Sequence, residues 1–416
     1  MGDDAAPASR LAAIGSSSDL DAVASASTST DVVVAGHISL DLYPRLLGPA
    51  TLEPGRLVVV GPATISTGGV VANTGVALHR LGVRVRLVGK VGSDLFGRAV
   101  LDALASRDSE LASDMIVSPG DVTSYTIVIN PPGVDRSFLH CPGANQSFSA
   151  QDVRDELLAG VRLFHFGYPP LMREMYAAGG AQLRRMFQRV HSAGPATSLD
   201  LCALDPESEA GHVPWERVLS RALPFVDIFA PSIGELLFIL DRPAHAQLEA
   251  GAELSAVVDR QRLAELGDVV LGMGAAVAAI KLGDQGLYLR TARDTARISA
   301  FCDRIGLAAD AWLGREVLAP CFAARSVAGT TGSGDCTIGG LLAALLRGED
   351  PAGAATSAAA VGACSVEGVD PASAIPPWPD VAARIAHGWP RLHVDIDLGH
   401  DVTVERDHVG TLMLLP

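Results

Sequence analysis

The chain has 416 residues, 48% of them hydrophobic and 19% charged, which is enough to build one large α/β domain or two smaller ones. Its formal net charge of −15 argues against a nucleic-acid-binding protein, because phosphate backbones are bound by basic surfaces. No apolar run reaches the roughly 18 residues that cross a bilayer, and the acidic start of the chain does not resemble a secretory leader. We therefore expect a globular protein that binds neither nucleic acid nor membrane.

The cysteines favour a reducing compartment. They are scattered and include no Cys-x-x-Cys pair, so they match neither a zinc site nor a disulfide framework. This pattern predicts a cytoplasmic protein. Cys336 follows directly on the most informative motif, where it is either a small buried residue or a thiol open to reagents.

In chain order, residues 1–30 are rich in Ala, Ser and Asp and predict a flexible N-terminal tail. Residues 31–390 carry the ordered pattern, beginning with a β-branched strand at Asp31–Gly36. Residues 391–416 form a C-terminal extension, in which Leu392–Leu398 is a candidate for an additional strand.

Two stretches, about 40–68 and 121–142, have the texture of a small antiparallel sheet outside the main domain. Strand-like runs occur at Leu57–Thr67, Thr123–Asn130 and Arg136–His140, and the last two are joined by the turn sequence Pro131–Asp135.

From about residue 150, apolar strand candidates alternate with helical patterns, which predicts right-handed crossovers and a mostly parallel sheet covered on both faces. Ligands of such sheets bind beyond the carboxyl ends of the strands. Asp41, Asn73, Glu235 and Asp335 each follow or flank such an end, so we expect them to share one site.

The loop Gly329–Asp335, followed by an apolar helix, is the most informative motif. Gly332, Ser333 and Gly334 let the backbone approach a ligand closely, and the unpaired amides of a first helical turn favour a phosphate. Asp335 would repel that phosphate unless it has a chemical task, such as taking a proton from an attacking hydroxyl. Considered alone, Asp335 could instead be a simple helix cap worth about 1 kcal/mol.

Further motifs occur in a fixed order around this loop: Gly36–Asp41, Gly68–Gly82, Gly89–Gly97, Pro142–Asn145, Val226–Glu235 and Lys281–Gly286. Together they resemble the signature regions of the ribokinase-like carbohydrate kinases, the pfkB family, over about residues 30–385. The resemblance implies an α/β fold, ribokinase-like, with a mostly parallel central sheet flanked by helices and a small antiparallel β lid. In that family the lid covers the sugar and is often a dimer interface.

The resemblance also implies an ATP-dependent, Mg²⁺-requiring kinase that phosphorylates a hydroxyl of a small sugar or nucleoside. Asp335 would be the general base, and the amides of Gly332, Ser333 and Gly334 would hold the transferring phosphoryl group. The remaining assignments are Asp41, Gly68, Gly69 and Asn73 for the sugar, Lys281, Gly283, Gly286 and Thr331 for ATP, and Glu235 for magnesium. For Asp41 a turn-stabilising role, and for Glu235 a solvated carboxylate at a helix start, remain the alternatives.

Three positions depart from the family pattern. Ser232 stands where the family usually has Asn, which alters the expected magnesium shell. Gly329 stands where an Asp often helps to bind an activating potassium ion, so we expect little potassium dependence. Val70 takes a position that is often Lys in ribokinases proper, which argues against that assignment.

Two other function classes stay open beside the kinase. One is a sugar-binding regulatory protein that kept the fold and lost the chemistry, which the presence of Asp335 and Glu235 disfavours. The other is a dinucleotide-binding turn, whose glycine spacing would be reversed here. The substrate is not fixed by the sequence, since Arg136 could meet a phosphosugar and Phe138 could stack on a nucleobase.

Overall fold

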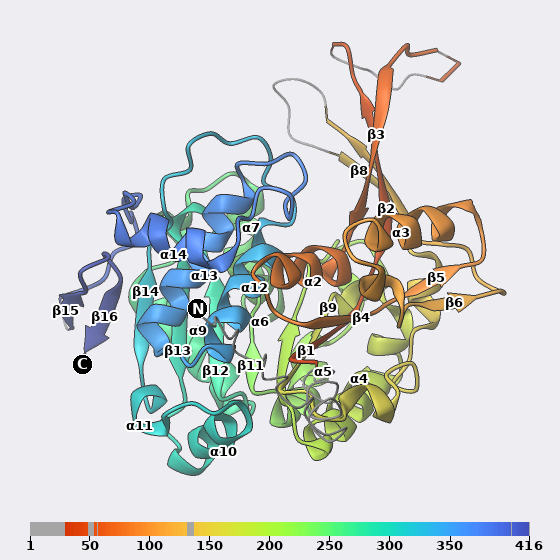
Figure 1. Ribbon diagram of the computed structural model, residues 1–416. Coiled ribbons are helices and arrows are strands. Elements are labelled where there is room, and N and C mark those ends of the chain that lie inside the picture. Colours follow the sequence, from red (N-terminus) through yellow and green to blue (C-terminus); the bar gives the residue numbers. More distant parts are fainter. Residues whose placement is uncertain (1–29, 49–53, 56, 131–136, 401, 416) are drawn as a thin grey trace, which may run out of the picture.

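The computed structural model describes residues 30–48, 54–55, 57–130, 137–400 and 402–415. Nearly all of the predicted N-terminal tail lies outside the described residues, and so do the turn Pro131–Asp135 and Arg136. Figure 1 shows a main body with a smaller sheet projecting from it.

The main sheet has ten strands among the described residues, and the six at one side run parallel to one another. In sheet order these are β4 (Val85–Val88), β1 (Val32–Gly36), β9 (Leu163–Gly167), β10 (Ala196–Asp200), β11 (Ile228–Phe229) and β12 (Val277–Lys281). The sheet continues antiparallel through β13 (Leu287–Thr291), β14 (Glu316–Ala319), β16 (Leu412–Leu415) and β15 (Thr403–Arg406). The predicted mostly parallel α/β fold is confirmed.

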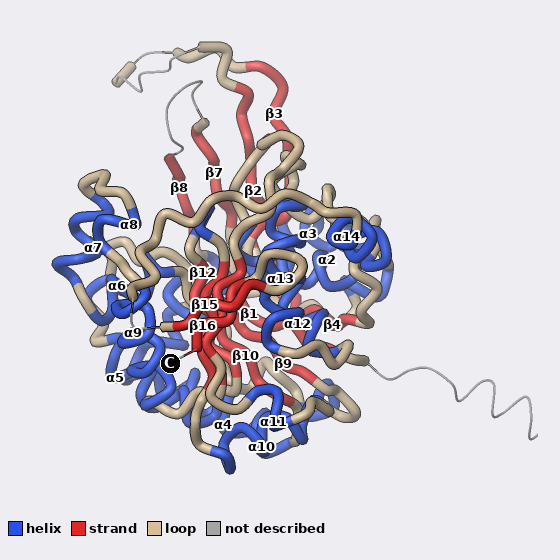
Figure 2. The backbone as a smooth tube through the Cα atoms, turned by 90° about the vertical axis from the view of Figure 1, so that its left-hand side faces the viewer, coloured by secondary structure: helices blue, strands red, loops and turns tan. Residues whose placement is uncertain are grey.

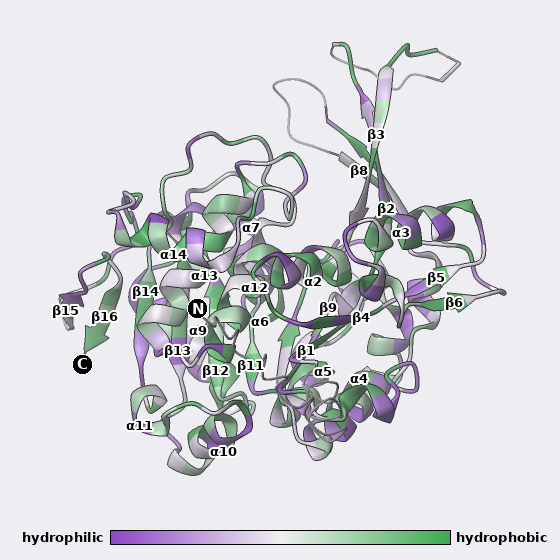
Figure 3. Ribbon diagram, in the orientation of Figure 1, coloured by the Kyte–Doolittle hydropathy of each residue, from purple (hydrophilic) through white to green (hydrophobic). Residues whose placement is uncertain are grey.

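The inner strands are apolar along their whole length because helices cover both faces of the sheet. Every residue of β1, β9 and β10 is buried, and Figure 3 shows β11 and β12 coloured as hydrophobic. Side chains from alternate positions of β1 enter the two different cores, with Val32 and Val34 on one face and Val33 and Ala35 on the other.

Helices pack on both faces (Figure 2). One core contains buried residues from α2 (Val70–Arg80), α3 (Leu95–Ala105), α10 (Thr295–Ile305), α11 (Ala309–Trp312), α12 (Ser333–Leu346), α13 (Pro351–Ser365) and α14 (Trp378–Ala386). The other contains buried residues from α4 (Arg173–Ala193), α5 (Trp215–Ala222), α6 (Ile233–Leu240) and α9 (Arg260–Gly272), with α7 (Arg242–Glu249) and α8 (Leu254–Val257) at its edge. In the part of the chain that the structure describes, no helix combines the length and apolar character of a membrane span.

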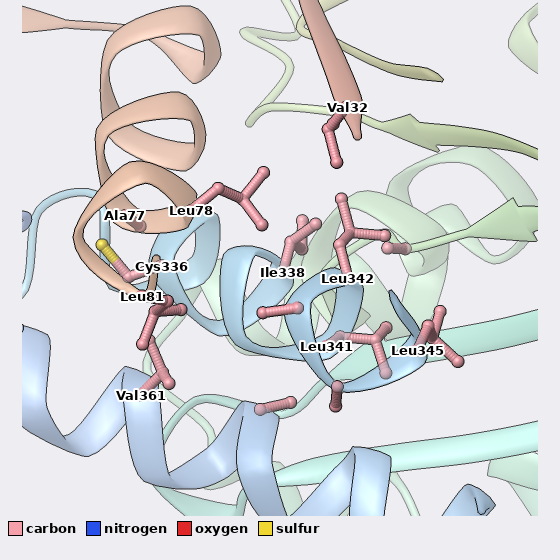
Figure 4. Close-up of a cluster of buried hydrophobic side chains, with 14 of the residues drawn as sticks. Val32, Ala77, Leu78, Leu81, Cys336, Ile338, Leu341, Leu342, Leu345 and Val361 are labelled. Carbon is pink, nitrogen blue, oxygen red and sulfur yellow. The ribbon is translucent and has the colours of Figure 1, made fainter. Parts of the chain in front are cut away.

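The helix α12 lies between α2 and α13, and its glycines allow close packing. An added Cβ at Gly339 would lie 3.0 Å from Ala77, and one at Gly340 would lie 2.8 Å from Val361. Figure 4 shows the apolar side chains of this interface, including Leu78, Ile338 and Val361. This packing fixes the position of the loop that enters α12.

The projecting sheet matches the predicted lid. Its strands, in order, are β3 (Gly61–Gly68), β2 (Ser39–Arg45), β7 (Tyr125–Ile129) and β8 (Ser137–Cys141). The outer pairs are antiparallel as predicted, whereas the central pair β2–β7 is parallel. Two short parallel strands, β5 (Lys90–Gly92) and β6 (Ile116–Ser118), form a separate sheet beside it.

The additional strand predicted at Leu392–Leu398 does not form. The segment crosses the loop after β12 instead, where the Asp395 amide donates to Oε1 of Gln285 (2.7 Å) and the Arg260 amide donates to the carbonyl of Asp397 (2.8 Å). At Asp395 and Asp397 its backbone is therefore held by a side chain and by the start of α9, and not by the backbone of a strand. The extension joins the main sheet further on, through β15 and β16.

A stack of four side chains fixes the start of this extension. The guanidinium of Arg391 lies 3.6 Å from the ring centre of Phe322, which stacks on Trp389 at 4.5 Å. On the far side of Trp389, the guanidinium of Arg384 lies 3.4 Å from the ring centre. Each guanidinium is attracted to the face of the ring that it covers, and more so when partly buried.

Candidate active site

The candidate site lies where the parallel strands end. His37 follows β1 directly, Tyr168 follows β9, and Ser232 lies shortly after β11. Asp200 and Lys281 are the last residues of β10 and β12. Neighbouring parallel strands end at the same edge of a sheet, so five segments far apart in sequence bring polar groups together there.

The loop before α12 adopts the shape that its glycines predict. Gly332 has a φ of 74°, in the left-handed region that glycine adopts without a steric penalty, and it holds the N-cap position with no side-chain cap. Asp335 lies inside the first helical turn and is therefore not the N-cap residue. The alternative of a simple capping role for Asp335 does not match this geometry.

The carboxylate of Asp335 is almost enclosed. Nδ2 of Asn73 donates to its Oδ2 at 2.9 Å, and the hydroxyl of Tyr168 donates to Oδ1 and Oδ2 at 2.9 and 2.8 Å. The Thr74 hydroxyl donates to the Asp335 carbonyl at 3.2 Å. Burial raises the pKa of Asp335 above its usual value, although the charge of Lys281 and the two side-chain donors act in the opposite direction.

A buried ion pair lies beside this carboxylate. Nζ of Lys281 lies 2.6 Å from Oδ1 of Asp200, and their side chains are 11% and 1% exposed. Burial raises the pKa of Asp200 well above its usual value; burial alone would lower the pKa of Lys281, but the charges of Asp200 and Glu235 outweigh it and raise that pKa. Oδ2 of Asp200 is buried without a hydrogen-bond partner in the described part of the chain.

Two cavities lie on either side of the loop. The first, of about 630 Å³, extends under the lid, and the second, of about 410 Å³, lies between the loop, α13 and the turn after β12. Of the predicted site residues, Asp41, Gly69, Asn73, Glu235, Thr331 and Gly332 line the first cavity. Lys281, Gly283, Gly286, Ser333 and Gly334 line the second.

Among the residues that line the cavities, the loop therefore separates those predicted for the sugar from those predicted for ATP, with one exception. The exception is Thr331, which was predicted on the ATP side and lines the first cavity, while its neighbour Thr330 lines the second. Asp335 lines neither cavity and is 2% exposed. The buried Cys336 is 0% exposed, and burial raises the pKa of its thiol well above the usual range, which fits the small buried residue rather than the reactive thiol.

Gly68 makes room for Asp41 rather than lining the cavity itself. An added Cβ at Gly68 would lie 2.2 Å from Oδ2 of Asp41, far inside contact distance. Oδ1 of Asp41 accepts a hydrogen bond from the Ser39 hydroxyl at 2.8 Å, and burial raises the pKa of Asp41. The glycine thus allows β2 and β3 to place a carboxylate between them, facing the first cavity.

Glu235 begins α6 as half of a capping box. Its Oε2 accepts from the Ser232 amide at 2.7 Å, and the Ser232 hydroxyl accepts from the Glu235 amide at 3.2 Å. Glu235 nevertheless lines the first cavity, so it combines the structural role with a place at the site.

A sequence model described as the pfkB family carbohydrate kinase matches residues 29–378, most of the chain. The chain belongs to the pfkB family of carbohydrate kinases. Among curated relatives, fructokinase-1 of Zea mays is 29% identical over 172 residues, which are 41% of this chain and 50% of that protein. Fructokinase-2 of Solanum habrochaites is 29% identical over 156 residues, 37% of this chain and 45% of that protein. The match thus spans about half the length of these curated relatives.

Solved structures of the same fold cover more of this pfkB-family chain. A ribokinase of Arabidopsis thaliana complexed with ribose and ATP superimposes with a TM-score of 0.65 at 17% identity, over 86% of this chain and 98% of that one. A fructokinase of Xylella fastidiosa with bound ATP gives a TM-score of 0.62 at 20% identity, over 86% and 98%. At these identities the likeness establishes the ribokinase fold and not the substrate.

Three residues of the site were not predicted from the sequence of this family member. Tyr168 follows one predicted strand and Asp200 ends another. A place at the carboxyl end of a strand was the sequence signal that could have identified both as site residues. His37 lies in the first family motif, between Gly36 and the lid strand. His37 lines the first cavity, and both of its ring nitrogens are buried without hydrogen-bond partners among the described residues. Burial lowers the pKa of the ring to about 3, so the ring is neutral.

Proposed function

We propose that the protein transfers the γ-phosphoryl group of ATP to a hydroxyl of an uncharged sugar or nucleoside, with Asp335 as the general base. The observation that carries this proposal is the position of the loop Thr331–Gly334 between two cavities, one lined by Asp41 and Asn73 and the other by Lys281. A kinase of this type must bring two ligands to opposite sides of one phosphoryl group, in line with one another.

In this reaction a new bond forms between the acceptor oxygen and the γ-phosphorus, and the bond from that phosphorus to the β–γ bridging oxygen breaks. The acceptor proton moves to Asp335, whose raised pKa favours proton uptake. The amides of Ser333 and Gly334, at the positive end of α12, would stabilise the charge on the phosphoryl oxygens. Lys281, with Nζ 3.7 Å from the Cβ position of Gly334, would add a positive charge there.

The charge of the first cavity favours a neutral acceptor. Among the described residues its lining contains four carboxylates, those of Asp41, Asp205, Glu235 and Glu249, and neither Lys nor Arg. Within this described lining, a phosphosugar or a sugar acid would enter a negative field that contains no Lys or Arg to pair its charge. The lining therefore disfavours phosphosugars and sugar acids as acceptors and favours neutral sugars and nucleosides.

The residues present fit Mg²⁺ bound with ATP. Magnesium takes few protein carboxylates because phosphates and waters supply most of its ligands, so the absence of a three-residue metal cluster from the described part of the chain is compatible with it. Glu235 uses one carboxylate oxygen in the capping box, and Oδ2 of Asp200 has no partner within the described residues. These two groups would hold the waters of the ion, which when bound would neutralise charge on the phosphates.

A weakly catalytic sugar-binding protein is the second candidate, and one observation favours it. The carboxylate that should receive the acceptor proton is enclosed by Asn73 and Tyr168. A protein that only binds sugar would have no need to expose it.

Two further features of the proposal concern the setting of the enzyme. All six cysteines are free, which supports a reducing, cytoplasmic location. The lid carries exposed apolar side chains, including Ile65 at 58% and Leu139 at 52%, which supports a homodimer that buries the lid.

An ADP-release assay with Mg·ATP tests the proposal. The acceptors would be D-fructose, D-ribose and adenosine, compared with fructose 6-phosphate and gluconate. We expect turnover on a neutral acceptor, its loss in Asp335→Asn, and wild-type turnover in Asp310→Asn, which changes an exposed aspartate of α11. Absence of turnover on every acceptor, with ligand-induced thermal stabilisation retained, would favour the binding protein instead.

A further inference from the structure

Tyr168 lies between the first cavity and the carboxylate of Asp335. Its side chain lines that cavity, while its hydroxyl lies within 2.9 Å of both carboxylate oxygens. Burial and the charge of Asp335 raise the pKa of Tyr168 well above its usual value, so the phenol keeps its proton and acts as the donor. It therefore makes the contact that an acceptor hydroxyl must make during catalysis.

The rest of the carboxylate is also engaged. Asn73 donates to Oδ2, and Asp335 is 2% exposed, so no oxygen faces an open cavity while the phenol is in place. Lys281, Asp200, Glu235 and the thiol of Cys202 supply the other charged or titratable surroundings of this centre. A hydroxyl entering the first cavity gains access to the base only where it displaces the Tyr168 hydroxyl.

The backbone at this position is unusual. Tyr168 has φ 66° and ψ 37°, in the left-handed region, and only one other non-glycine among the described residues, Ala178, has a positive φ. Tyr168 follows Gly167, the last residue of β9, and precedes Pro169. The left-handed conformation therefore falls on the tyrosine and not on the neighbouring glycine. Strain of this kind persists where surrounding contacts impose it, and here the contacts are Asp335 and the ring of His37, whose centre lies 5.8 Å away.

We propose that Tyr168 is a specificity-determining residue that occupies the place of the acceptor hydroxyl until the acceptor arrives, and so keeps water away from Asp335. This inference rests on the proposed kinase function. Water in contact with Asp335 could give up its proton to the carboxylate and attack the γ-phosphorus, which would convert ATP to ADP and inorganic phosphate. An acceptor held by Asp41, Asn73 and His37 has enough contacts to displace the phenol, whereas a single water has not.

The first test compares Tyr168→Phe with the matched variant Tyr176→Phe, which removes the hydroxyl of another buried tyrosine, on α4. In Tyr168→Phe we expect ATP hydrolysis without acceptor to rise about tenfold relative to wild type, the factor that corresponds to one ordinary hydrogen bond. Tyr176→Phe should hydrolyse ATP as wild type does. Equal hydrolysis by wild type and Tyr168→Phe, at whatever absolute level, would overturn the inference.

A second readout does not depend on turnover. The sequence contains five tyrosines, so the ¹³Cζ signal of Tyr168 can be assigned by its disappearance in Tyr168→Phe. We expect this signal to move on Asp335→Asn, and to move in the same direction when the acceptor, tested as D-fructose and D-ribose, is added to wild type. If the enzyme phosphorylates an acceptor but the Tyr168 signal does not move when that acceptor is added, the displacement is refuted and the proposed kinase function is not. Displacement by sugar and a rise in hydrolysis, without phosphoryl transfer to any acceptor, would refute the proposed function alone.

Discussion

Nζ of Lys281 lies 2.6 Å from Oδ1 of Asp200, although the two residues are 81 positions apart in the chain and end β12 and β10, the strands on either side of β11. The sequence contains two lysines, and the other, Lys90, pairs with Asp152 at 3.2 Å well away from the loop. The Lys281–Asp200 pair should therefore affect both the stability of the fold and the positive charge available to the proposed nucleotide.

Lys281→Met should lower both stability and nucleotide affinity. Loss of one partner leaves Asp200 buried without its counter-charge, which costs roughly 3–5 kcal/mol of unfolding free energy. The double variant Lys281→Met/Asp200→Asn should recover most of that loss in urea denaturation but keep a raised KM for ATP. Lys90→Met, the matched control, should lose stability and leave the KM for ATP unchanged. Recovery of the KM in the double variant would contradict a role for the ammonium group in binding phosphate.

Asp335→Asn should lower kcat by roughly 10²–10⁴-fold, the usual contribution of a general base. The base must be ionised, and burial raises its pKa, so the activity of wild type should be complete at high pH and fall as the pH drops through a value above 3.8. The measurement is kcat/KM against pH. A profile with the same acid limb in Asp335→Asn would assign that limb to another group.

Gly332→Ala should inactivate the enzyme, whereas Gly329→Ala in the same loop should be tolerated. At Gly332 the added Cβ would lie 2.9 Å from Nδ2 of Asn73 and 2.8 Å from Pro371, at a φ that alanine rarely adopts. At Gly329 the nearest atom would be 3.5 Å away, an ordinary contact. We expect kcat to fall at least tenfold in the first variant only. Similar kcat values for both would show that the loop tolerates displacement.

Potassium should have little effect on the wild-type rate, because Gly329 supplies no carboxylate. Gly329→Asp should introduce potassium activation, since a side chain at this position begins 3.5 Å and 3.6 Å from the carbonyl oxygens of Gly368 and Val369. The measurement is turnover in KCl against tetramethylammonium chloride at equal ionic strength. A large potassium effect on wild type would place the ion elsewhere.

Ile65→Asp should convert the expected dimer to a monomer, because it puts a charge into the exposed apolar surface of β3. Light scattering after gel filtration measures the mass directly. Val117→Asp, at an exposed apolar position on β6 outside the lid (47% exposed against 58% for Ile65), should leave the mass unchanged. A wild-type monomer, or a dimer that persists in Ile65→Asp, would exclude the lid as the interface.

Much of the fold was predictable because the signals were local. The strand runs around β1, β9 and β10 are short, β-branched or aromatic, and buried throughout, so periodicity and family motifs pointed to the same sheet. The parallel pairing of β2 with β7 was not predictable in this way, because hairpin signals concern neighbours in sequence and these strands are far apart.

The site was predictable only as far as its motifs extend. Asn73 and Asp335 belong to two motifs and do meet, at 2.9 Å. Tyr168 belongs to no motif, and a tyrosine after a buried strand is usually a core residue. Its left-handed backbone could not be predicted either, because only glycine signals that conformation in a sequence. The pairing of Asp200 with Lys281 depends on the order of the strands, which puts β10 and β12 on either side of β11 and which the sequence alone left open.

The stacked side chains at the start of the C-terminal extension bear on the order in which the second cavity is assembled. They are Arg391, Phe322, Trp389 and Arg384. Phe322 and Leu392 line the second cavity, and β16 borders the strand β14 that leads to Phe322. Residues beyond the family match, from Trp389 onward, therefore complete a wall of the cavity proposed for ATP. The lid and the six parallel strands all precede this wall in the chain, so the cavity proposed for ATP is complete only once the residues up to Leu392 have been made and folded onto the sheet.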